Sequence, residues 1–251
     1  MCVHANRETE SVAYLLLILC WENNRLKLVD EVKDLGILFD NELKFENHIS
    51  DKINKANSII GIIRRSYRYL NITNFTPLYK AMVRSYFDYA SSITCPIKKE
   101  YIKSIEYVQR RATKLVPEIK HLSYEKRLLK LNLPTLVYRR LRGDMIELYK
   151  ITHNLYNIDT SKLINFRKDS ITRIGLRGHD YVIDILYIEN KHKKRFLPNR
   201  IAKVWNTLPI WVVNSECLNK FKNNLDRLWK KQEIVYDFTR DIDTSIYMFH
   251  I

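Results

Sequence analysis

The chain has 251 residues, of which 46% are hydrophobic and 12% aromatic, a composition typical of a folded protein and not of a disordered tail. Its formal net charge is +15, from 43 Lys and Arg against 28 Asp and Glu, which favours an anionic partner such as a nucleic acid or a membrane surface. The four cysteines and seven histidines are scattered without Cys-x-x-Cys or His-x-x-x-His spacing, so the sequence predicts neither a zinc knuckle nor a disulfide framework.

The positive charge is concentrated in the middle of the chain. Residues 48–156 carry 21 basic and 8 acidic side chains, whereas residues 1–47 carry 5 and 9 and residues 157–251 carry 17 and 11. This asymmetry indicates a binding surface for a polyanion in the middle segment. Solvated helix faces that happen to carry like charges are the alternative explanation.

The first 47 residues hold an apolar run and a β signal. The run at 12–21 is shorter than the roughly 20 residues that span a bilayer, and it lacks the flanks of a signal peptide, so we expect a buried strand or helix. Residues 31–47 predict a β-hairpin with its turn at Asp40 and Asn41 and a second strand or extended piece reaching Phe45. Gly36 inside the first strand indicates a bulge or a close backbone approach.

Helical periodicity begins at His48. It predicts one helix over 49–67 and a second over 75–89, the latter with Thr73 as N-cap and Pro77 in its first turn. The side of the first helix that faces away from its apolar residues carries three arginines: Arg64, Arg65 and Arg68.

Two further helices, predicted over 98–116 and 135–155, each have an apolar side and a cationic side. A shorter helix around Tyr124 and Leu128 connects them. The cationic side chains of the pair include Lys99, Lys103, Arg110, Arg111 and Lys114 on the first helix and Arg139, Arg140, Arg142 and Lys150 on the second. Two helices of this kind, joined by a short connector, predict a platform for a polyanion.

The rest of the chain is less regular. Residues 157–199 form a loop-rich basic linker, with one possible strand near 181–187 and a cluster of basic residues at 191–195 that suits a further nucleic-acid contact or a nuclear-localisation signal. Residues 200–232 predict a small C-terminal unit of two short helices, and 233–251 a tail. The expected fold is therefore mainly α: a helical bundle over 48–156 with a short N-terminal β-hairpin at 31–47 and a C-terminal helical unit.

Several blocks of residues, in this order along the chain, resemble a known family. They are Val-Lys-Asp-Leu-Gly-Ile at 32–37, Leu-Tyr-Lys-Ala-Met-Val-Arg-Ser at 78–85, Ile-Glu-Tyr-Val-Gln-Arg-Arg-Ala-Thr-Lys at 105–114, Tyr-Glu-Lys-Arg-Leu at 124–128 and Trp-Asn-Thr-Leu-Pro at 205–209. Together they resemble the carboxy-terminal part of a non-LTR retrotransposon (LINE-type) reverse transcriptase, from the end of the palm through the thumb and beyond. Residues 1–30 do not resemble this family.

The resemblance implies that the helical bundle is thumb-like and that its partner is RNA or DNA. In a polymerase the thumb closes on the template–primer duplex, and its basic side chains contact phosphate and do not read sequence. The expected nucleic-acid-binding residues are Lys103, Arg110, Arg111, Lys114, Arg139, Arg140 and Arg142, with Arg64, Arg65 and Arg68 as a second set.

The same resemblance argues against catalysis by this chain. Polymerase chemistry needs two metal ions held by clustered carboxylates, which in reverse transcriptases include an aromatic-x-Asp-Asp turn. The sequence contains no Asp-Asp dipeptide. We therefore expect a fragment without the catalytic palm, with no catalytic site, metal or cofactor of its own.

Other functions stay open at this point. The principal alternative is a non-functional remnant or a helical protein-interaction module, whose protein partner the sequence does not identify. A basic membrane-surface module anchored by residues 14–21 is the second alternative, although we expect no membrane association. An intracellular location, nuclear or cytoplasmic, is expected if the protein is expressed.

Overall fold

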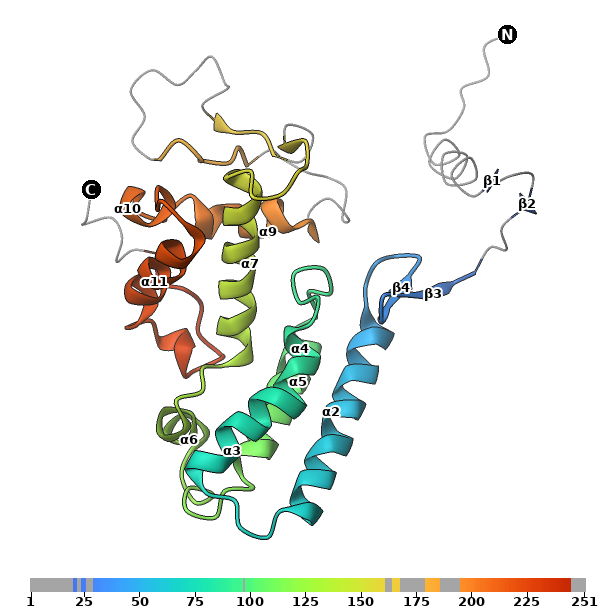
Figure 1. The fold of residues 1–251 in the computed structure, drawn as a ribbon, viewed down its shortest axis with the longest axis vertical. Helices are drawn as coiled ribbons and strands as arrows, with labels where there is room; N and C mark the ends of the chain where they lie inside the picture. The colour runs from blue at the N-terminus through green and yellow to red at the C-terminus, as the bar shows by residue number, and fades with distance from the viewer. Residues whose placement is uncertain are drawn as a thin grey trace. The chain divides into compact units, whose positions relative to one another are not determined.

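The computed structural model describes residues 20–21, 24–25, 29–96, 98–160, 164–167, 179–185 and 195–244 (Figure 1). Within these ranges the protein is mainly helical, with short antiparallel strand pairs before the first helix, which confirms the predicted fold class. The chain forms two compact units, Met1–Asn41 and Glu42–Ile251. The apolar run predicted at 12–21 and the basic residues at 191–194 lie largely or wholly outside the described residues.

The N-terminal unit contains two antiparallel strand pairs. Strand β1 (Cys20–Trp21) pairs with β2 (Asn24–Arg25), and β3 (Glu31–Asp34) pairs with β4 (Ile37–Asp40). In the second pair Glu31 lies opposite Asp40, so the whole hairpin fits within ten residues.

The hairpin turns earlier than the sequence predicted. Leu35 and Gly36, with φ of 46° and 79°, form the turn between β3 and β4. Two consecutive residues with positive φ match the twist of paired strands, and glycine adopts such a φ without strain. A turn does follow β4 at residues 41–42, next to the predicted position at Asp40 and Asn41, but it does not join two paired strands. The predicted pairing across that turn and the predicted bulge at Gly36 were therefore wrong. The second strand also ends at Asp40, because Phe45 has a positive φ of 59° and starts the next helix.

The larger unit begins with two helical segments joined by a short connector. Helix α2 (Glu46–Ser66) buries Ile49, Ala56 and Ile60 along one side. After the connector, α3 (Ile72–Tyr79), a π-helical segment η1 (Lys80–Arg84) and α4 (Ser85–Asp88) run continuously. The N-cap of α3 is Asn71, which exchanges side-chain hydrogen bonds with Asn74, so the predicted Thr73 cap was wrong.

The next three helices complete the bundle: α5 (Lys99–Thr113), α6 (Tyr124–Leu131) and α7 (Leu136–Thr152). Helix α5 runs parallel to α2. At the start of both helices Glu46 accepts a hydrogen bond from Tyr101 and pairs with Lys98, and farther along both Arg111 donates to Asn57. The C-terminal ends of α2 and α5 therefore lie at the same end of the bundle (Figure 1).

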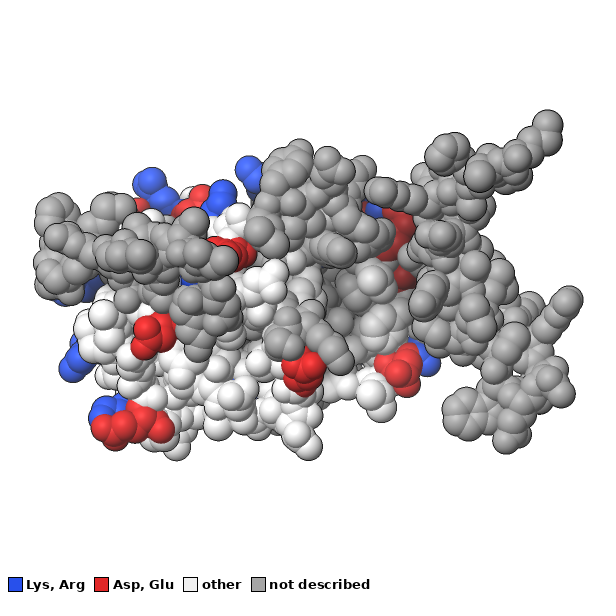
Figure 2. Space-filling model, turned by 90° about the horizontal axis from the view of Figure 1, so that it is seen from above, with Lys and Arg blue, Asp and Glu red and all other residues white. Residues whose placement is uncertain are grey.

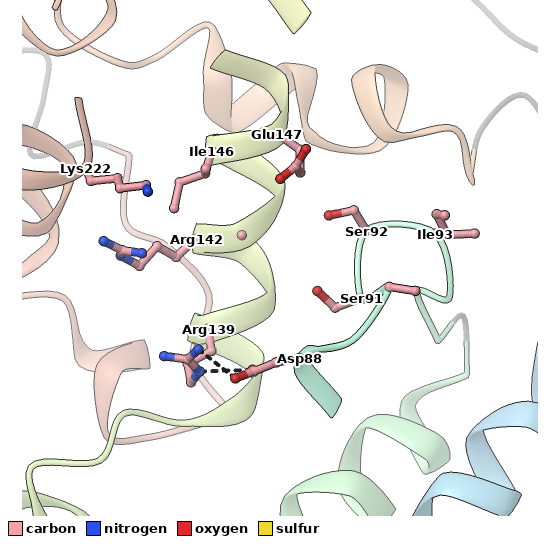
Figure 3. Close-up of a pocket in the computed structure, with 11 residues that line it drawn as sticks. Asp88, Ser91, Ser92, Ile93, Arg139, Arg142, Ile146, Glu147 and Lys222 are labelled. Atoms are coloured by element: carbon pink, nitrogen blue, oxygen red, sulfur yellow. Dashed lines mark hydrogen bonds and ion pairs between the residues drawn. The ribbon is translucent and has the colours of Figure 1, made fainter. Parts of the chain in front are cut away.

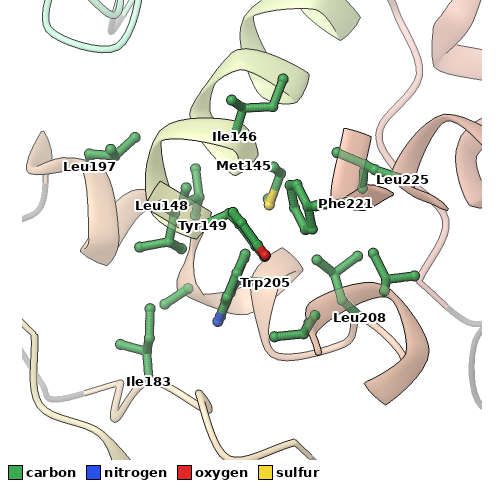
Figure 4. Packing of buried hydrophobic residues seen from close by; sticks show 14 of the residues in the cluster. Met145, Ile146, Leu148, Tyr149, Ile183, Leu197, Trp205, Leu208, Phe221 and Leu225 are labelled. Atoms are coloured by element: carbon green, nitrogen blue, oxygen red, sulfur yellow. The ribbon is translucent and has the colours of Figure 1, made fainter. Parts of the chain in front are cut away.

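The C-terminal helices share one core with α7. Helices α9 (Leu197–Trp205), α10 (Ile210–Val213) and α11 (Leu218–Trp229), with the 3₁₀ turn η4 (Glu233–Val235), surround its apolar side. Trp205 lies fully buried among these helices, and Tyr149 of α7 stacks on Phe221 of α11 with ring centroids 4.3 Å apart (Figure 4). Of the strand considered near 181–187, the described residues show one bridge, between Phe166 and Ile183. None of the described helices is both long and apolar enough to cross a membrane.

An ion pair fixes α9 to α7. Arg200 donates to both oxygens of Asp144, at 3.2 and 2.8 Å, and also donates to the carbonyl oxygens of Ser92 and Arg195. The Asp144 side chain is only 4% exposed. Because Arg200 satisfies this buried carboxylate, the pair joins the loop after α4, helix α7 and helix α9.

We expect Arg200→Leu to destabilise the protein by about 3 kcal/mol, because the substitution leaves a buried carboxylate without its partner. Urea unfolding followed by circular dichroism measures this change. The double variant Arg200→Leu with Asp144→Leu should recover part of the loss, since the buried carboxylate that lost its partner is then also removed. A loss below about 1 kcal/mol in the single variant, the range of an exposed pair, would contradict this role.

Candidate nucleic-acid interface

Helix α5 has one buried side and one open cationic side. Ile105, Val108 and Ala112 are buried against the bundle. The exposed residues recur at helical spacing on the other side: Lys103, Tyr107, Arg110, Arg111 and Lys114. The bundle therefore gathers the four basic residues of this stretch that were predicted to bind nucleic acid on one continuous surface, which we call the α5 surface.

No carboxylate neutralises these cations among the described residues. Arg110 lies over two aromatic rings, 5.7 Å from the centroid of Tyr107 and 6.0 Å from that of Tyr124. Arg111 donates through Nη1 to Asn57 of α2 at 3.4 Å. Their positive charges consequently stay available to an anion from solution, and cation–π contact holds Arg110 beside Tyr107.

The arginines of α2 extend this surface. Arg64 and Arg65 lie exposed in the last turn of α2, and Arg68 is exposed in the connector that follows. Arg64 comes two helical turns after Asn57, the residue that contacts Arg111, so it lies on the side of α2 that faces the α5 surface. The second set of predicted residues thus lies at the end of the bundle where α5 also ends.

The α7 arginines have different surroundings. Arg139 donates through Nε and Nη2 to Asp88 at 3.1 and 2.8 Å. Arg142 donates in the same way to Asp226 of α11 at 2.5 and 2.7 Å, which raises the pKa of its guanidinium. These arginines link α7 to α4 and to α11, so the structure does not leave them as open as the cations of α5.

Arg140 is turned into the protein. Its Nε atom is buried and has no hydrogen-bond acceptor among the described residues, and burial lowers the pKa of the guanidinium. The structure therefore divides the predicted two-helix platform into an open α5 surface and an α7 group that is paired or buried. Figure 2, seen from above the view of Figure 1, shows Lys and Arg side chains interspersed with Asp and Glu side chains on that face.

A buried polar network orients α5. The carboxylate of Glu106, 1% exposed, accepts a hydrogen bond from the Tyr124 hydroxyl at 2.5 Å and one from the backbone N–H of Leu136 at 2.9 Å. Gln109 accepts from the Tyr79 hydroxyl at 2.7 Å and donates to the carbonyl of Pro134 at 3.0 Å. One side of α5 is thereby joined to α3, α6 and the start of α7, which leaves the cationic side facing solvent.

A second polar contact attaches α6 to the same helix. Arg127 of α6 donates to the Thr113 hydroxyl at 3.0 Å and to the carbonyls of Leu122 and Arg110 at 2.6 and 3.4 Å. These bonds fix the backbone at Arg110. Sequence reasoning missed this supporting set, although Glu106, Gln109 and Thr113 recur at helical spacing among the apolar residues of α5.

Burial raises the pKa of Glu106 to about 7. Removing the carboxylate from water is the main cause, and the hydrogen bonds from Tyr124 and from the backbone at Leu136 and Val137 act in the opposite direction.

In the described part of the chain, no three His, Cys, Asp or Glu side chains come together in a group that could hold a metal ion.

A comparison with curated proteins found one sequence that is similar to this chain. An uncharacterized protein of Caenorhabditis elegans is 24% identical over 134 residues, a segment that covers 52% of this chain and 66% of that protein. The chain thus spans just under two thirds of the length of that relative. No family model matches the chain, and no solved structure matches it.

The titration of Glu106 predicts a pH-dependent stability. Below its ordinary value of 4.5 the carboxyl group is neutral in both states, and between 4.5 and about 7 the unfolded chain loses the proton first. The free energy of unfolding should therefore fall as the pH rises through this window, by about 3 kcal/mol at 1.4 kcal/mol per pKa unit.

We expect Glu106→Gln to abolish this component of the pH dependence, because glutamine does not titrate. Urea unfolding between about pH 5 and pH 8 measures the slope, with Glu118→Gln on the exposed surface as the matched control. If both variants keep the wild-type slope of the free energy of unfolding against pH, Glu106 does not titrate in this window.

Proposed function

We propose that this protein binds the backbone of RNA or DNA through the α5 surface, and that it is a fragment related to the thumb and post-thumb region of a non-LTR retrotransposon reverse transcriptase. The observation that carries the proposal is the set of cations on one open side of α5 without carboxylate partners among the described residues. The charge excess of residues 48–156 supports it.

The chemistry of the surface suits phosphate. Lysine and arginine side chains that neutralise phosphates release condensed counterions, so affinity falls steeply with salt and carries little sequence preference. Tyr107, 58% exposed between Lys103 and Arg110, offers an aromatic face on which a sugar or an unpaired base can stack. The expected ligand is a duplex or a structured strand bound by its backbone.

The block at 105–114, which carries part of the family resemblance, has two roles in this arrangement. Within the block at 105–114, Glu106, Gln109 and Thr113 bond to neighbouring helices, while Arg110 and Arg111 face solvent. One stretch of sequence therefore both assembles the bundle and presents its charge. We propose a binding role without catalysis, since the chain has no Asp-Asp dipeptide of the kind that holds polymerase metals.

The triple variant Arg110→Glu, Arg111→Glu, Lys114→Glu should lower affinity for a fluorescein-labelled duplex by more than about 100-fold in low salt, because it turns the α5 surface acidic. Fluorescence polarisation measures the affinity. None of these side chains donates a buried hydrogen bond to another described residue, so circular dichroism should show an intact fold.

The matched control reverses the same amount of charge elsewhere. Lys203→Glu, Lys230→Glu and Lys231→Glu change exposed lysines in or after the C-terminal helices and leave the α5 surface untouched. We expect this control to bind within a few-fold of the wild type after allowance for net charge. Equal losses in both triple variants would indicate non-specific attraction, and unchanged binding in the α5 variant would refute the proposal.

A further inference from the structure

A pocket of about 500 Å³ opens beside α7, and the α5 surface contributes no residue to it (Figure 3). Its walls come from three parts of the larger unit. The residues that matter for its chemistry are Arg139, Arg142 and Gly143 of α7, Ser91 and Ser92 of the loop after α4, and Lys222 of α11. Segments far apart in the sequence thus meet around one hollow.

Cations from two helices converge on this pocket. In Figure 3 Lys222 reaches from α11 toward α7 and lies beside Arg142, while Arg139 lies lower on α7 next to Asp88. Arg139 and Arg142 are already paired with Asp88 and Asp226, whereas the charge of Lys222 has no carboxylate partner among the described residues. The arrangement therefore favours an anion in the pocket.

Hydrogen-bond donors are left over on all three cations. Arg139 and Arg142 each use Nε and Nη2 for a carboxylate, which leaves Nη1 of each without a protein acceptor among the described residues. Lys222 has no hydrogen bond or ion pair within the same part of the chain. The two carboxylate pairs hold the guanidinium planes in place, so these free donors are fixed in advance.

The acidic residues of the pocket are already occupied. Asp88 accepts from Arg84 as well as from Arg139. Glu147 accepts from Lys150 at 2.8 Å and from the Tyr156 hydroxyl at 2.6 Å. Neither carboxylate is free to neutralise Lys222, and the pocket keeps a surplus of positive charge.

Gly143 keeps the floor of the pocket open. A β-carbon added there would lie 3.8 Å from the Ser91 hydroxyl oxygen, an ordinary contact distance, so packing between α7 and the loop does not require glycine. Glycine in the interior of a helix lowers stability relative to alanine. A glycine that packing does not need, at the floor of a cationic pocket, is suited to close approach by a ligand.

We propose that this pocket binds a phosphate group, held by Lys222 and by the free edges of Arg139 and Arg142. A phosphate offers several acceptor oxygens in a tetrahedral arrangement and therefore takes bonds from several converging donors, which a carboxylate does less well. Two sources supply this chemistry: a free phosphate monoester, such as a nucleoside 5′-monophosphate, or a phosphate of a bound strand.

Isothermal titration of the full chain with inorganic phosphate and with adenosine 5′-monophosphate tests the site. Lys222→Glu should weaken binding of both ligands by at least about tenfold, because it replaces the pocket lysine, which has no carboxylate partner among the described residues. Lys203→Glu on α9 changes the net charge equally and should leave both affinities unchanged. Absence of binding to the wild type at millimolar ligand, or equal binding by the two variants, would overturn the proposal.

A second variant separates binding from folding. Gly143→Ala adds a methyl group to the floor without a steric clash, so it should raise the midpoint of thermal unfolding. At the same time it should lower the affinity for adenosine 5′-monophosphate. Unchanged affinity in this variant would overturn the role of the floor and of the pocket with it.

Competition by an oligonucleotide without a terminal phosphate identifies the source. If the oligonucleotide displaces adenosine 5′-monophosphate from a protein that carries the reversed α5 charges, the phosphate belongs to a strand. If it does not, the ligand is a free monoester, and both results support phosphate binding at this site. Because this variant carries reversed charges on the α5 surface, the binding of adenosine 5′-monophosphate to the pocket is tested independently of the proposed nucleic-acid function.

Discussion

The structure depends on how the buried carboxylate of Glu106 is satisfied. Its hydrogen-bond donors come from the hydroxyl of Tyr124 on α6 and the backbone at Leu136 on α7, and Gln109 beside it ties in Tyr79 of α3. A buried carboxylate without partners is strongly unfavourable, so these elements must reach their positions together. One rotation of α5 about its axis satisfies the network, and that rotation turns the cationic side outward.

Arginine has two different roles in this bundle, and the position of carboxylates decides between them. Where Asp144 or Asp226 lies within reach, Arg200 or Arg142 joins helices across a bidentate pair. Where no carboxylate of the described residues pairs with the arginine, as for Arg110, the guanidinium rests on aromatic rings and stays open to solvent. The number of basic residues therefore overstates the binding surface, and the ion pairs show which of them build the fold.

Helical periodicity predicted much of this fold from sequence, because α2, α5 and α7 each bury a stripe of apolar residues with a helical repeat. Local chemistry was less informative. The turn at Leu35 and Gly36 sits inside an apolar run, and the short helix α10 carries too few residues to show a period.

The candidate site was harder to predict for a physical reason. The open side of α5 follows from the spacing of its own residues, but the state of an arginine on α7 depends on distant partners. Arg139 pairs with a residue 51 positions away and Arg142 with one 84 positions away, and no local pattern marks such pairs.

The salt dependence of duplex binding by the wild-type protein tests the central claim most directly. If the four cations of α5 each neutralise a phosphate, the logarithm of the association constant should fall linearly with that of the salt concentration, with a slope of about −4. Binding that does not change with salt, or no binding in low salt, would contradict the account.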